Sequence, residues 1–543
     1  MKILMIGSGI SGLCAAIEAA AAGHTVELVS PFPSERSQSV MAAGGINGAY
    51  EAGKDSPILH AEDTFLGGGE IENRETLLEL CSAAPEQLRF LTELGVRFNR
   101  EPDGTLSRRT LGGHSQGRTA YAGLSTGKQI VTALVNKCRE YEIRGSVKRT
   151  LGLHFYRALI REGVCYGALF CSEEIGTLLE IRADVTVMAT GGMNRMFGRT
   201  TGSTLCDGYC TGKLLEQGVA LRNLEFIQYH PTAVKTESKR MLISETARGE
   251  GGRLFYLRPD GTRCYFMEER FGPKGNLMPR DVVSRCVYDC PSRVYLDITF
   301  PGKEGIRERL GEIDSLCREY LGLDPAREPI PVSPAVHFFM GGIRVDGHHR
   351  TNIQRLYAVG ECASCYHGAN RLGGNSLLTA IYSGRKAAGA IHASEQPVAV
   401  FPDFSRELAE QEEYFQRLRS AKSRYPAVFL LNDLCSIMTR NLGIVRDRER
   451  LEEGLAAIAL YRESAKALRF DPSVSLYENY RLPALLLLGE AVLRSALGRQ
   501  ESRGAHFRRD FPEEKASFRG PSVISLEGEK WNLRYEISGE VTL

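Results

Sequence analysis

Residues 1 to about 230 alternate between short apolar runs and segments in which apolar residues recur with helical spacing. Residues 1–30 hold an apolar strand pattern, a glycine-rich turn, an alanine-rich helix pattern and a second strand pattern that ends at Val29. Residues 184–192 hold another apolar run, which leads into two adjacent glycines. This alternation predicts an α/β domain built on a largely parallel sheet.

The pattern changes at about residue 232. Up to residue 333 the chain combines short strand patterns, a Pro-Asp-Gly turn, and helix patterns around residues 280–288 and 306–320. We interpret residues 232–333 as an α+β domain inserted into the first one, which then resumes over residues 334–396.

The last part of the chain is different again. After a linker that contains two prolines, residues 405–500 are mostly helix-periodic and predict an antiparallel helical domain. Residues 501–543 form a tail with short strand patterns. The most apolar run, residues 482–488, contains Pro483 and is far shorter than the roughly 20 residues of a membrane span, so we expect the buried face of a helix.

Length and composition narrow the possibilities. A chain of 543 residues is too long for one hydrophobic core, so two to four domains are expected. A net charge of +2 favours neither nucleic acid nor an anionic membrane surface as a partner. The 14 cysteines are scattered, without haem-attachment or ferredoxin-like spacing, which predicts a reduced, cytoplasmic setting and no resident metal.

The glycine-rich turn carries the clearest chemical signal. Residues 7–12 read GSGISG between a strand and a helix, which is the context that a dinucleotide-binding fingerprint requires. Gly7 permits the tight turn, Gly9 allows the backbone to approach a pyrophosphate, and Gly12 allows the helix to pack on the strand. His337 and Arg371 each lie close to paired glycines. A dinucleotide beside polar and cationic groups suggests redox chemistry on a carboxylate.

Several longer segments resemble the flavoprotein subunits of fumarate reductases and succinate dehydrogenases, a family that includes L-aspartate oxidase. The resemblance runs over nearly the whole chain and rests on these segments in family order: SVMAAGGIN (39–47), EFIQYHPT (225–232), SETARGEGG (244–252), PRDVVSR (279–285), VHFFMGGI (336–343), HGANRLGGNSLL (367–378) and ESRGAH (501–506). It implies a Rossmann-like FAD-binding domain (1–231 and 334–396), an inserted α+β capping domain (232–333) and a C-terminal helical domain (405–500), with the active site between flavin and cap.

The resemblance also implies roles for individual residues. His337 and Arg371 match a clamp for the substrate carboxylates, and a guanidinium suits this task because its planar fork binds a carboxylate through two hydrogen bonds. His230 and Ser244 match further substrate ligands. Arg280 matches the proton donor, and the residues that match the relay reloading it are Glu245 and Arg248.

The cofactor residues implied by the resemblance fall into three groups. Those expected to line the pyrophosphate and isoalloxazine are Gly7, Gly9, Ser11, Gly12, Ser37, Ser39, Ala43, Gly44 and Gly45. Glu361 is expected to hold the ribose or the ribityl chain, Asp207 to support the cofactor, and Ser376 and Leu377 to point amides at the flavin from a helix N-terminus. Ser30 stands where many dinucleotide folds place an acid, which argues against a plain NAD site.

Three departures from the family pattern matter. Gln38 replaces the histidine that bonds covalently to FAD in membrane complexes of this family, so we predict non-covalent FAD and a lower flavin potential. Leu111 replaces the acid that engages the substrate amine in L-aspartate oxidase. Cys362 and Cys365 form a C-x-x-C pair, which we interpret as packing rather than as a redox dithiol.

These observations predict an FAD-dependent fumarate reductase flavoprotein. The chain has no haem or iron–sulfur motif of its own, so we expect an iron–sulfur partner subunit that supplies electrons and a cytoplasmic location, at the membrane only through partners. The alternatives are an L-aspartate oxidase, a reductase of another unsaturated carboxylate, and a non-catalytic assembly subunit. The intact acid–base set argues against the last of these.

Overall fold

The computed structural model describes residues 1–49, 55–123, 125–172, 177–237, 239–420, 426–466, 468 and 470–536. At its centre lies a five-stranded parallel sheet with the strand order β19-β10-β1-β2-β6. Its strands are β1 (Lys2–Ile6), β2 (Thr25–Ser30), β6 (Val147–Leu151), β10 (Val185–Met188) and β19 (Leu356–Ala358). The strand pattern predicted for residues 184–192 therefore forms β10, an inner strand that pairs with β1 on one side and β19 on the other.

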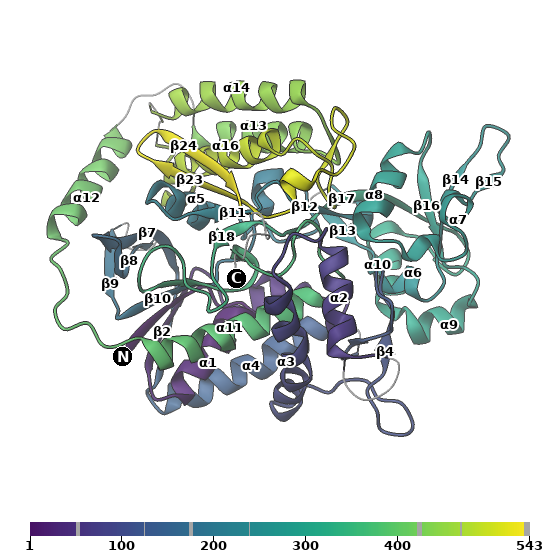
Figure 1. Ribbon diagram of the computed structural model, residues 1–543, viewed down its shortest axis with the longest axis horizontal. Helices are drawn as coiled ribbons and strands as arrows, with labels where there is room; N and C mark the ends of the chain where they lie inside the picture. Colours follow the sequence, from purple (N-terminus) through teal and green to yellow (C-terminus); the bar gives the residue numbers. More distant parts are fainter. Residues whose placement is uncertain are drawn as a thin grey trace.

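Helices cover one face of this sheet and a small antiparallel sheet covers the other (Figure 1). The helices of this layer are α1 (Ile10–Ala21), α4 (Thr126–Ile143) and α11 (Asn375–Ser394). Outside it, α3 (Arg74–Glu93) packs on α11, and α2 (Pro57–Gly67) packs on α3. The small antiparallel sheet consists of β7 (Leu153–Arg161), β8 (Val164–Ser172) and β9 (Leu178–Arg182). A separate three-stranded sheet consists of β3 (Ile46–Asn47), β5 (Thr119–Ala120) and β4 (Arg108–Arg109). Helix α11, from late in the chain, packs beside α1 and so joins the two halves of the domain.

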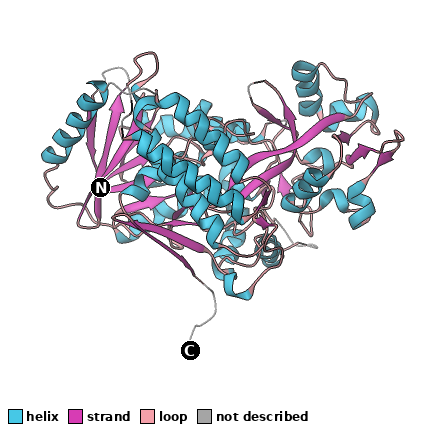
Figure 2. Cartoon of the chain, turned by 90° about the horizontal axis from the view of Figure 1, so that it is seen from above, coloured by secondary structure: helices cyan, strands magenta, loops and turns pink. Residues whose placement is uncertain are grey.

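The cap projects from one side of the body (Figures 1 and 2). Its strands are β12 (Ile227–Lys235), β13 (Arg240–Leu242), β14 (Arg253–Leu257), β15 (Arg263–Cys264), β16 (Val294–Asp297) and β17 (Ile330–Phe339). Its helices are α6 (Thr246–Gly249), α7 (Phe266–Phe271), α8 (Arg280–Asp289), α9 (Gly302–Arg309) and α10 (Gly311–Leu321). The cap has a hydrophobic core of its own. The boundaries of this domain at residues 231 and 333 stay a prediction. Both positions fall inside strands, β12 and β17, which pair with each other.

The C-terminal helices lie above the central sheet in Figure 1. They are α12 (Ser405–Ser420), α13 (Ala427–Asn441), α14 (Arg448–Ala465), α15 (Leu476–Tyr480) and α16 (Leu482–Gly498). The apolar run 482–488 opens α16 and is almost entirely buried, which confirms the prediction of a buried helix face. No helix in the described ranges has the length and apolarity that a bilayer crossing requires.

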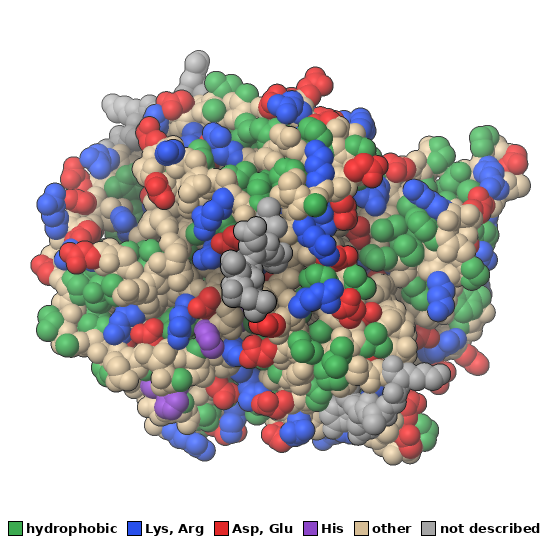
Figure 3. Space-filling view, in the orientation of Figure 1, with side chains coloured by type: hydrophobic (Ala, Val, Ile, Leu, Met, Phe, Trp, Pro, Cys, Tyr) green, Lys and Arg blue, Asp and Glu red, His purple; other side chains and the backbone are tan. Residues whose placement is uncertain are grey.

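The last strands that the structure describes, β23 (Ser522–Glu527) and β24 (Lys530–Tyr535), form a hairpin that packs on the main body. It completes a sheet with β11 (Leu221–Arg222), β18 (Gly342–Arg344) and β20 (Ala363–Ser364). The remaining short elements are α5 (Tyr209–Glu216), β21 (Val445–Arg446) and β22 (Phe507–Arg508). Acidic and basic side chains are interspersed on the face shown in Figure 3, in line with the small net charge.

Candidate active site

A cavity of about 590 Å³ lies where the central sheet, the cap and the C-terminal helices meet. Parallel α/β sheets bind their ligands outside the carboxyl ends of the strands, which is where this cavity opens. The predicted cofactor residues that line it are Gly7, Gly9, Ser11, Ser30, Ser37, Ser39, Ala43, Gly44, Gly45, Asp207, Glu361, Ser376 and Leu377. The predicted catalytic residues that line it are His230, Ser244, Glu245, Arg280, His337 and Arg371.

Two predicted residues lie behind the wall of the cavity. A Cβ atom on Gly12 would lie 2.0 Å from the carbonyl oxygen of Gly7, so this glycine serves the close packing of α1 on the sheet. Gly7 itself has a φ of +112°, and a Cβ there would lie 2.2 Å from the carbonyl oxygen of Ala189. Both glycines therefore carry out the tasks expected of a dinucleotide fingerprint. Arg248 is the second of these residues, and it contacts Glu245, which does line the cavity.

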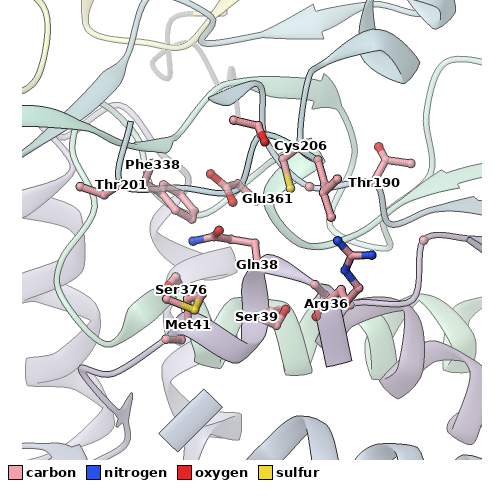
Figure 4. Close-up of a pocket in the computed structure, with 18 of the residues that line it drawn as sticks. Arg36, Gln38, Ser39, Met41, Thr190, Thr201, Cys206, Phe338, Glu361 and Ser376 are labelled. Carbon is pink, nitrogen blue, oxygen red and sulfur yellow. The ribbon is translucent and has the colours of Figure 1, made fainter. Parts of the chain in front are cut away.

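The segment after β2 forms the floor of the cavity in Figure 4. Ser39 accepts a hydrogen bond at its Oγ from the backbone N–H of Ile10, with a distance of 3.2 Å, which ties this segment to the start of α1. Gln38 points into the cavity below Glu361 and Phe338, and its Oε1 accepts a hydrogen bond of 2.5 Å from the backbone of Ser203. The position of the expected covalent attachment is thus occupied by a carboxamide that faces the cavity.

Glu361 faces the cavity from the short helix at Gly360–Cys362. Its Oε1 accepts a hydrogen bond of 3.2 Å from the backbone of Phe339. Burial raises the pKa of this carboxyl to about 7, and the Phe339 amide and Arg371 oppose that rise. A carboxyl with a pKa near neutrality can accept or donate a hydrogen bond to a hydroxyl-rich ligand such as a ribityl chain.

The chain fits FAD at this site. The Oγ of Ser37 is buried without a hydrogen-bond partner among the described residues, and a Cβ on Gly44 would meet nothing within 4 Å. Ser376 and Leu377 lie in the first turn of α11, whose amides and dipole favour an electron-rich group. The unpaired donor, the open glycine and the helix terminus all leave room for a polar, anionic dinucleotide.

Three charged side chains form the centre of the substrate end. Arg280, at the start of α8, donates to Oε2 of Glu245 from Nε at 3.0 Å and from Nη2 at 2.7 Å. Arg248 donates from Nη2 to Oε1 of the same carboxylate at 2.9 Å. Burial raises the pKa of Glu245, but the two guanidinium groups outweigh it and lower the pKa to about 2. Glu245 is therefore ionised and bridges the two arginines.

Arg371 lies next to this trio without a carboxylate partner of its own. Its Nε and Nη2 donate to Oε1 of Gln228, at 3.3 and 3.1 Å, and its guanidinium lies 4.2 Å from the ring centre of Phe338. Among the described residues it forms no ion pair. Burial and the neighbouring Arg280 lower the pKa of Arg371 well below its usual value. A buried cation in this state favours an anionic ligand in the cavity.

The two histidines come from the paired strands that lead into the cap. The rings of His230 on β12 and His337 on β17 lie 5.1 Å apart between centres. Burial, helped by Arg280, lowers the pKa of both rings well below the usual range, so both are neutral and can donate one N–H each. Thr201 orients His337 through a hydrogen bond of 2.7 Å to Nδ1. Ser244 borders the same end of the cavity.

The sequence reasoning missed two residues of this site. Gln228 accepts from Arg371 and, at 3.0 Å, from Nη1 of Arg280, so one amide oxygen links the two guanidinium groups. Gln228 stands two positions before His230 on the same strand, and residues i and i+2 of a strand lie on the same face. The predicted role of His230 could therefore have pointed to Gln228 as a second residue of the site. Thr201 had no such signal, because it is distant in sequence from His337 and lies in an irregular loop.

The departures from the family pattern have clear places in the structure. Leu111 is fully buried and lines the cavity beside the loop that carries Arg371. Cys362 and Cys365 are buried free thiols that do not line the cavity. Burial raises the pKa of both thiols, that of Cys365 to about 12, so both are protonated, which supports packing rather than redox chemistry.

Comparison with known proteins places this architecture in a family. A model described as an FAD binding domain matches residues 2–377, and one described as the fumarate reductase flavoprotein C-terminus matches residues 431–538. The chain is 36% identical to the succinate dehydrogenase flavoprotein subunit of Bacillus subtilis, over 94% of this chain and 91% of that protein. It is 34% identical to L-aspartate oxidase of Pyrococcus furiosus, over 97% and 99%.

The fold agrees with these matches. A solved structure of E. coli quinol fumarate reductase superposes with a TM-score of 0.90 at 30% identity and covers 100% of this chain and 98% of that one. The chain is an FAD-dependent oxidoreductase and belongs to the family of succinate dehydrogenase and fumarate reductase flavoproteins, which includes L-aspartate oxidase.

Proposed function

We propose that this protein is the flavoprotein subunit of a fumarate reductase and converts fumarate to succinate. One observation carries the proposal: three buried guanidinium groups gather at the inner end of the cavity with the one ionised carboxylate of Glu245, which pairs with Arg248 and Arg280, while Arg371 holds only the amide oxygen of Gln228. The surplus of two positive charges matches the two carboxylates of fumarate. Glu361 offsets this surplus only in part, because burial raises its pKa to about 7.

Four residues are suited to bind the two carboxylates. Arg371 can bind one of them through two parallel hydrogen bonds, since its fork at present holds only one amide oxygen. His230, His337 and Ser244 offer neutral donors at the same end of the cavity. Neutral donors add hydrogen bonds without adding buried charge, which keeps the total charge close to that of a dicarboxylate.

Arg280 is the proton donor in this proposal. When bound and reduced, FAD would supply the hydride that adds to one alkene carbon. Arg280 delivers a proton to the other carbon, and Glu245 Oε2, which accepts two hydrogen bonds from Arg280, passes a proton back. Arg248, buried and hydrogen-bonded to Oε1 and to the carbonyl of Asn276, completes the path from the cap. The low exposure of all three side chains keeps bulk water from the acid–base step.

Electrons must reach the site from outside, because the sequence has no haem or iron–sulfur motif. We propose an iron–sulfur subunit as the donor, and a cytoplasmic location with membrane contact only through partners.

The FAD of this protein should be bound without a covalent link, because the carboxamide of Gln38 cannot form one. FAD should therefore stay in the supernatant when the protein is precipitated with acid. Flavin fluorescence that stays on the denatured polypeptide would contradict this.

L-aspartate oxidase is the second candidate, because a relative of that name matches 97% of this chain. Leu111 argues against it, since an apolar side chain gives no partner to a buried substrate ammonium. A reductase of another unsaturated carboxylate would use the same residues in the same roles.

Three assays on one preparation separate these candidates. We expect reduction of fumarate by a reduced low-potential dye, slower oxidation of succinate, and little oxidation of L-aspartate with oxygen or fumarate. Robust aspartate oxidation without dye-driven fumarate reduction would overturn the proposal in favour of the oxidase. Strong activity on a different unsaturated acid, with fumarate a poor substrate, would replace the substrate and keep the mechanism.

A further inference from the structure

One part of the cavity wall combines residues from two domains. Ser30 and Phe32, which follow β2, and His154 on β7 belong to the dinucleotide-binding domain. Tyr477 and Arg481 belong to the C-terminal helices, at α15 and the residue that follows it. The short helix α15 therefore closes a part of the cavity that the fingerprint of the first domain does not reach.

Tyr477 is held rigidly in this wall. Its ring stacks on the ring of His154, with 4.2 Å between the centres and 24° between the planes. Its hydroxyl donates a hydrogen bond of 2.5 Å to Oδ2 of Asp207, and Arg481 donates to the same oxygen at 2.9 Å. Asp207 thus joins α15 to the loop before α5, which also borders the cavity.

The position of this wall tells which part of FAD it meets. In a dinucleotide-binding βαβ unit the pyrophosphate lies at the start of the first helix, and the adenosine ribose lies beyond the end of the second strand. Here that strand is β2, which ends at Ser30, and the cavity continues from Ser30 past Phe32 to His154 and Tyr477. The proposed catalytic residues His230, Glu245 and Arg280 come instead from the elements of the cap. We therefore assign the aromatic wall to the adenosine end.

We propose that α15 is a second binding element for FAD, which holds the adenosine half against the Tyr477–His154 pair. An aromatic face stabilises a purine base by stacking and is tolerant of its exact orientation. Because Gln38 cannot form a covalent link, retention of the cofactor depends on such contacts. The helical domain would then control how long FAD stays bound, in addition to completing the fold.

The release of FAD from the holoenzyme tests this assignment. Tyr477→Ala should release FAD about tenfold faster than the wild type, the size expected for the loss of one base–aromatic contact. Tyr477→Phe keeps the ring and loses only the bond to Asp207, so its release rate should stay within about threefold. The absorption spectrum and midpoint potential of the bound flavin should not change, because the substitution lies at the other end of the cofactor.

Tyr461→Ala is the matched control. Tyr461 lies on α14 in the same domain, its hydroxyl also bonds an aspartate, Asp433, and it does not line the cavity. Its substitution should leave FAD release unchanged. A release rate for Tyr477→Ala within twofold of the wild type, or equal acceleration by Tyr461→Ala, would overturn the proposal. Equal acceleration by Tyr477→Phe would overturn the stacking role.

If Tyr477→Ala does not yield folded protein, Tyr477→Leu carries the same expectation. Leucine fills most of the volume of the ring but has no π-face, so it should still accelerate release about tenfold. Wild-type retention of FAD by Tyr477→Leu would show that volume alone matters and would also overturn the stacking role.

Discussion

This protein has two buried clusters of arginine and glutamate side chains. In one of them every charge has an oppositely charged partner, and in the other the arginines outnumber the carboxylates. One surrounds Arg499 and Glu501, between α16 and the C-terminal hairpin, and the other surrounds Arg280 and Glu245 at the cavity. In both clusters the side chains are almost fully shielded from water. The difference lies in whether each charge has a protein partner.

The C-terminal cluster is paired throughout. Arg499 donates to Glu225 at 2.6 Å, to Glu501 at 2.8 Å and to two backbone carbonyls. Glu501 also accepts two hydrogen bonds from Arg503, at 2.8 and 2.9 Å. None of these side chains lines the cavity. A charge cluster that is paired in this way stabilises a unique packing and has no unpaired charge that a ligand could neutralise.

The active-site cluster keeps a surplus of positive charge. Glu245 serves both Arg280 and Arg248, and Arg371 holds only the amide oxygen of Gln228. Arginines around a cavity without matching carboxylates cost stability in the empty protein, and an anionic substrate removes that cost. The comparison teaches that buried ion pairs reveal a binding site only when their charges do not balance.

The largest expected effect comes from the active-site cluster. Arg280→Ala should keep FAD and fumarate binding but lower kcat with a reduced dye by at least about 10²–10⁴-fold, the range for loss of a general acid. Steady-state kinetics and fumarate titration of the flavin spectrum measure the two quantities separately. A variant within about threefold of wild-type turnover would refute Arg280 as the donor.

The second effect tests the paired cluster. Arg499→Met should lower the free energy of unfolding by about 3–5 kcal/mol, because it leaves the buried carboxylate of Glu225 without its ion-pair partner. Urea unfolding followed by circular dichroism gives the value. Arg406→Met, which removes an exposed partner of Glu410, is the control and should change stability by no more than about 1 kcal/mol. Equal losses in both variants would remove the distinction between the clusters.

The third effect is smaller and has the opposite sign. Arg371→Met removes a buried cation that has no carboxylate partner, so the substrate-free protein should gain up to about 1 kcal/mol of stability. The same change should raise the KM for fumarate about 100-fold, because a charge-assisted bidentate contact is lost. Urea unfolding and initial rates on one preparation check both. Destabilisation as large as that of Arg499→Met would show that Arg371 is structurally paired.

The last effect concerns Glu361. Burial raises its pKa from an ordinary value near 4.5 to about 7, so the folded FAD-free protein binds this proton more tightly than the unfolded chain does. The stabilisation is complete below pH 4.5 and is lost as the pH rises through 7, which should lower stability by roughly 2–3 kcal/mol between pH 5 and pH 8. Glu361→Gln should flatten this part of the stability–pH curve. An unchanged curve in the variant would contradict the raised pKa.

Much of the architecture could be predicted from local patterns. The glycine spacing at residues 7–12 between a strand and a helix implies a dinucleotide fold, because only glycine permits the close approaches seen at Gly7 and Gly12. The apolar run 482–488 predicted a buried helix face, and the structure confirms it in α16. The antiparallel sheet β7–β9 was not foreseen, because its hydrophobic runs, read locally, fit the strands of a parallel sheet equally well.

The sequence by itself determined the fold class, the cofactor and the types of residue available for catalysis, since these depend on short-range spacing and on motif order. Only the tertiary structure decided which charges are paired. In the sequence, Arg371 and Arg499 are the same residue type. In the structure, Arg371 contacts Gln228, 143 positions away, and Arg499 contacts Glu225, 274 positions away, so only Arg499 has a carboxylate partner among the described residues. The same holds for Tyr477 and His154, which meet across two domains. Distances between residues far apart in the chain are set by packing of the whole molecule, and no local pattern encodes them.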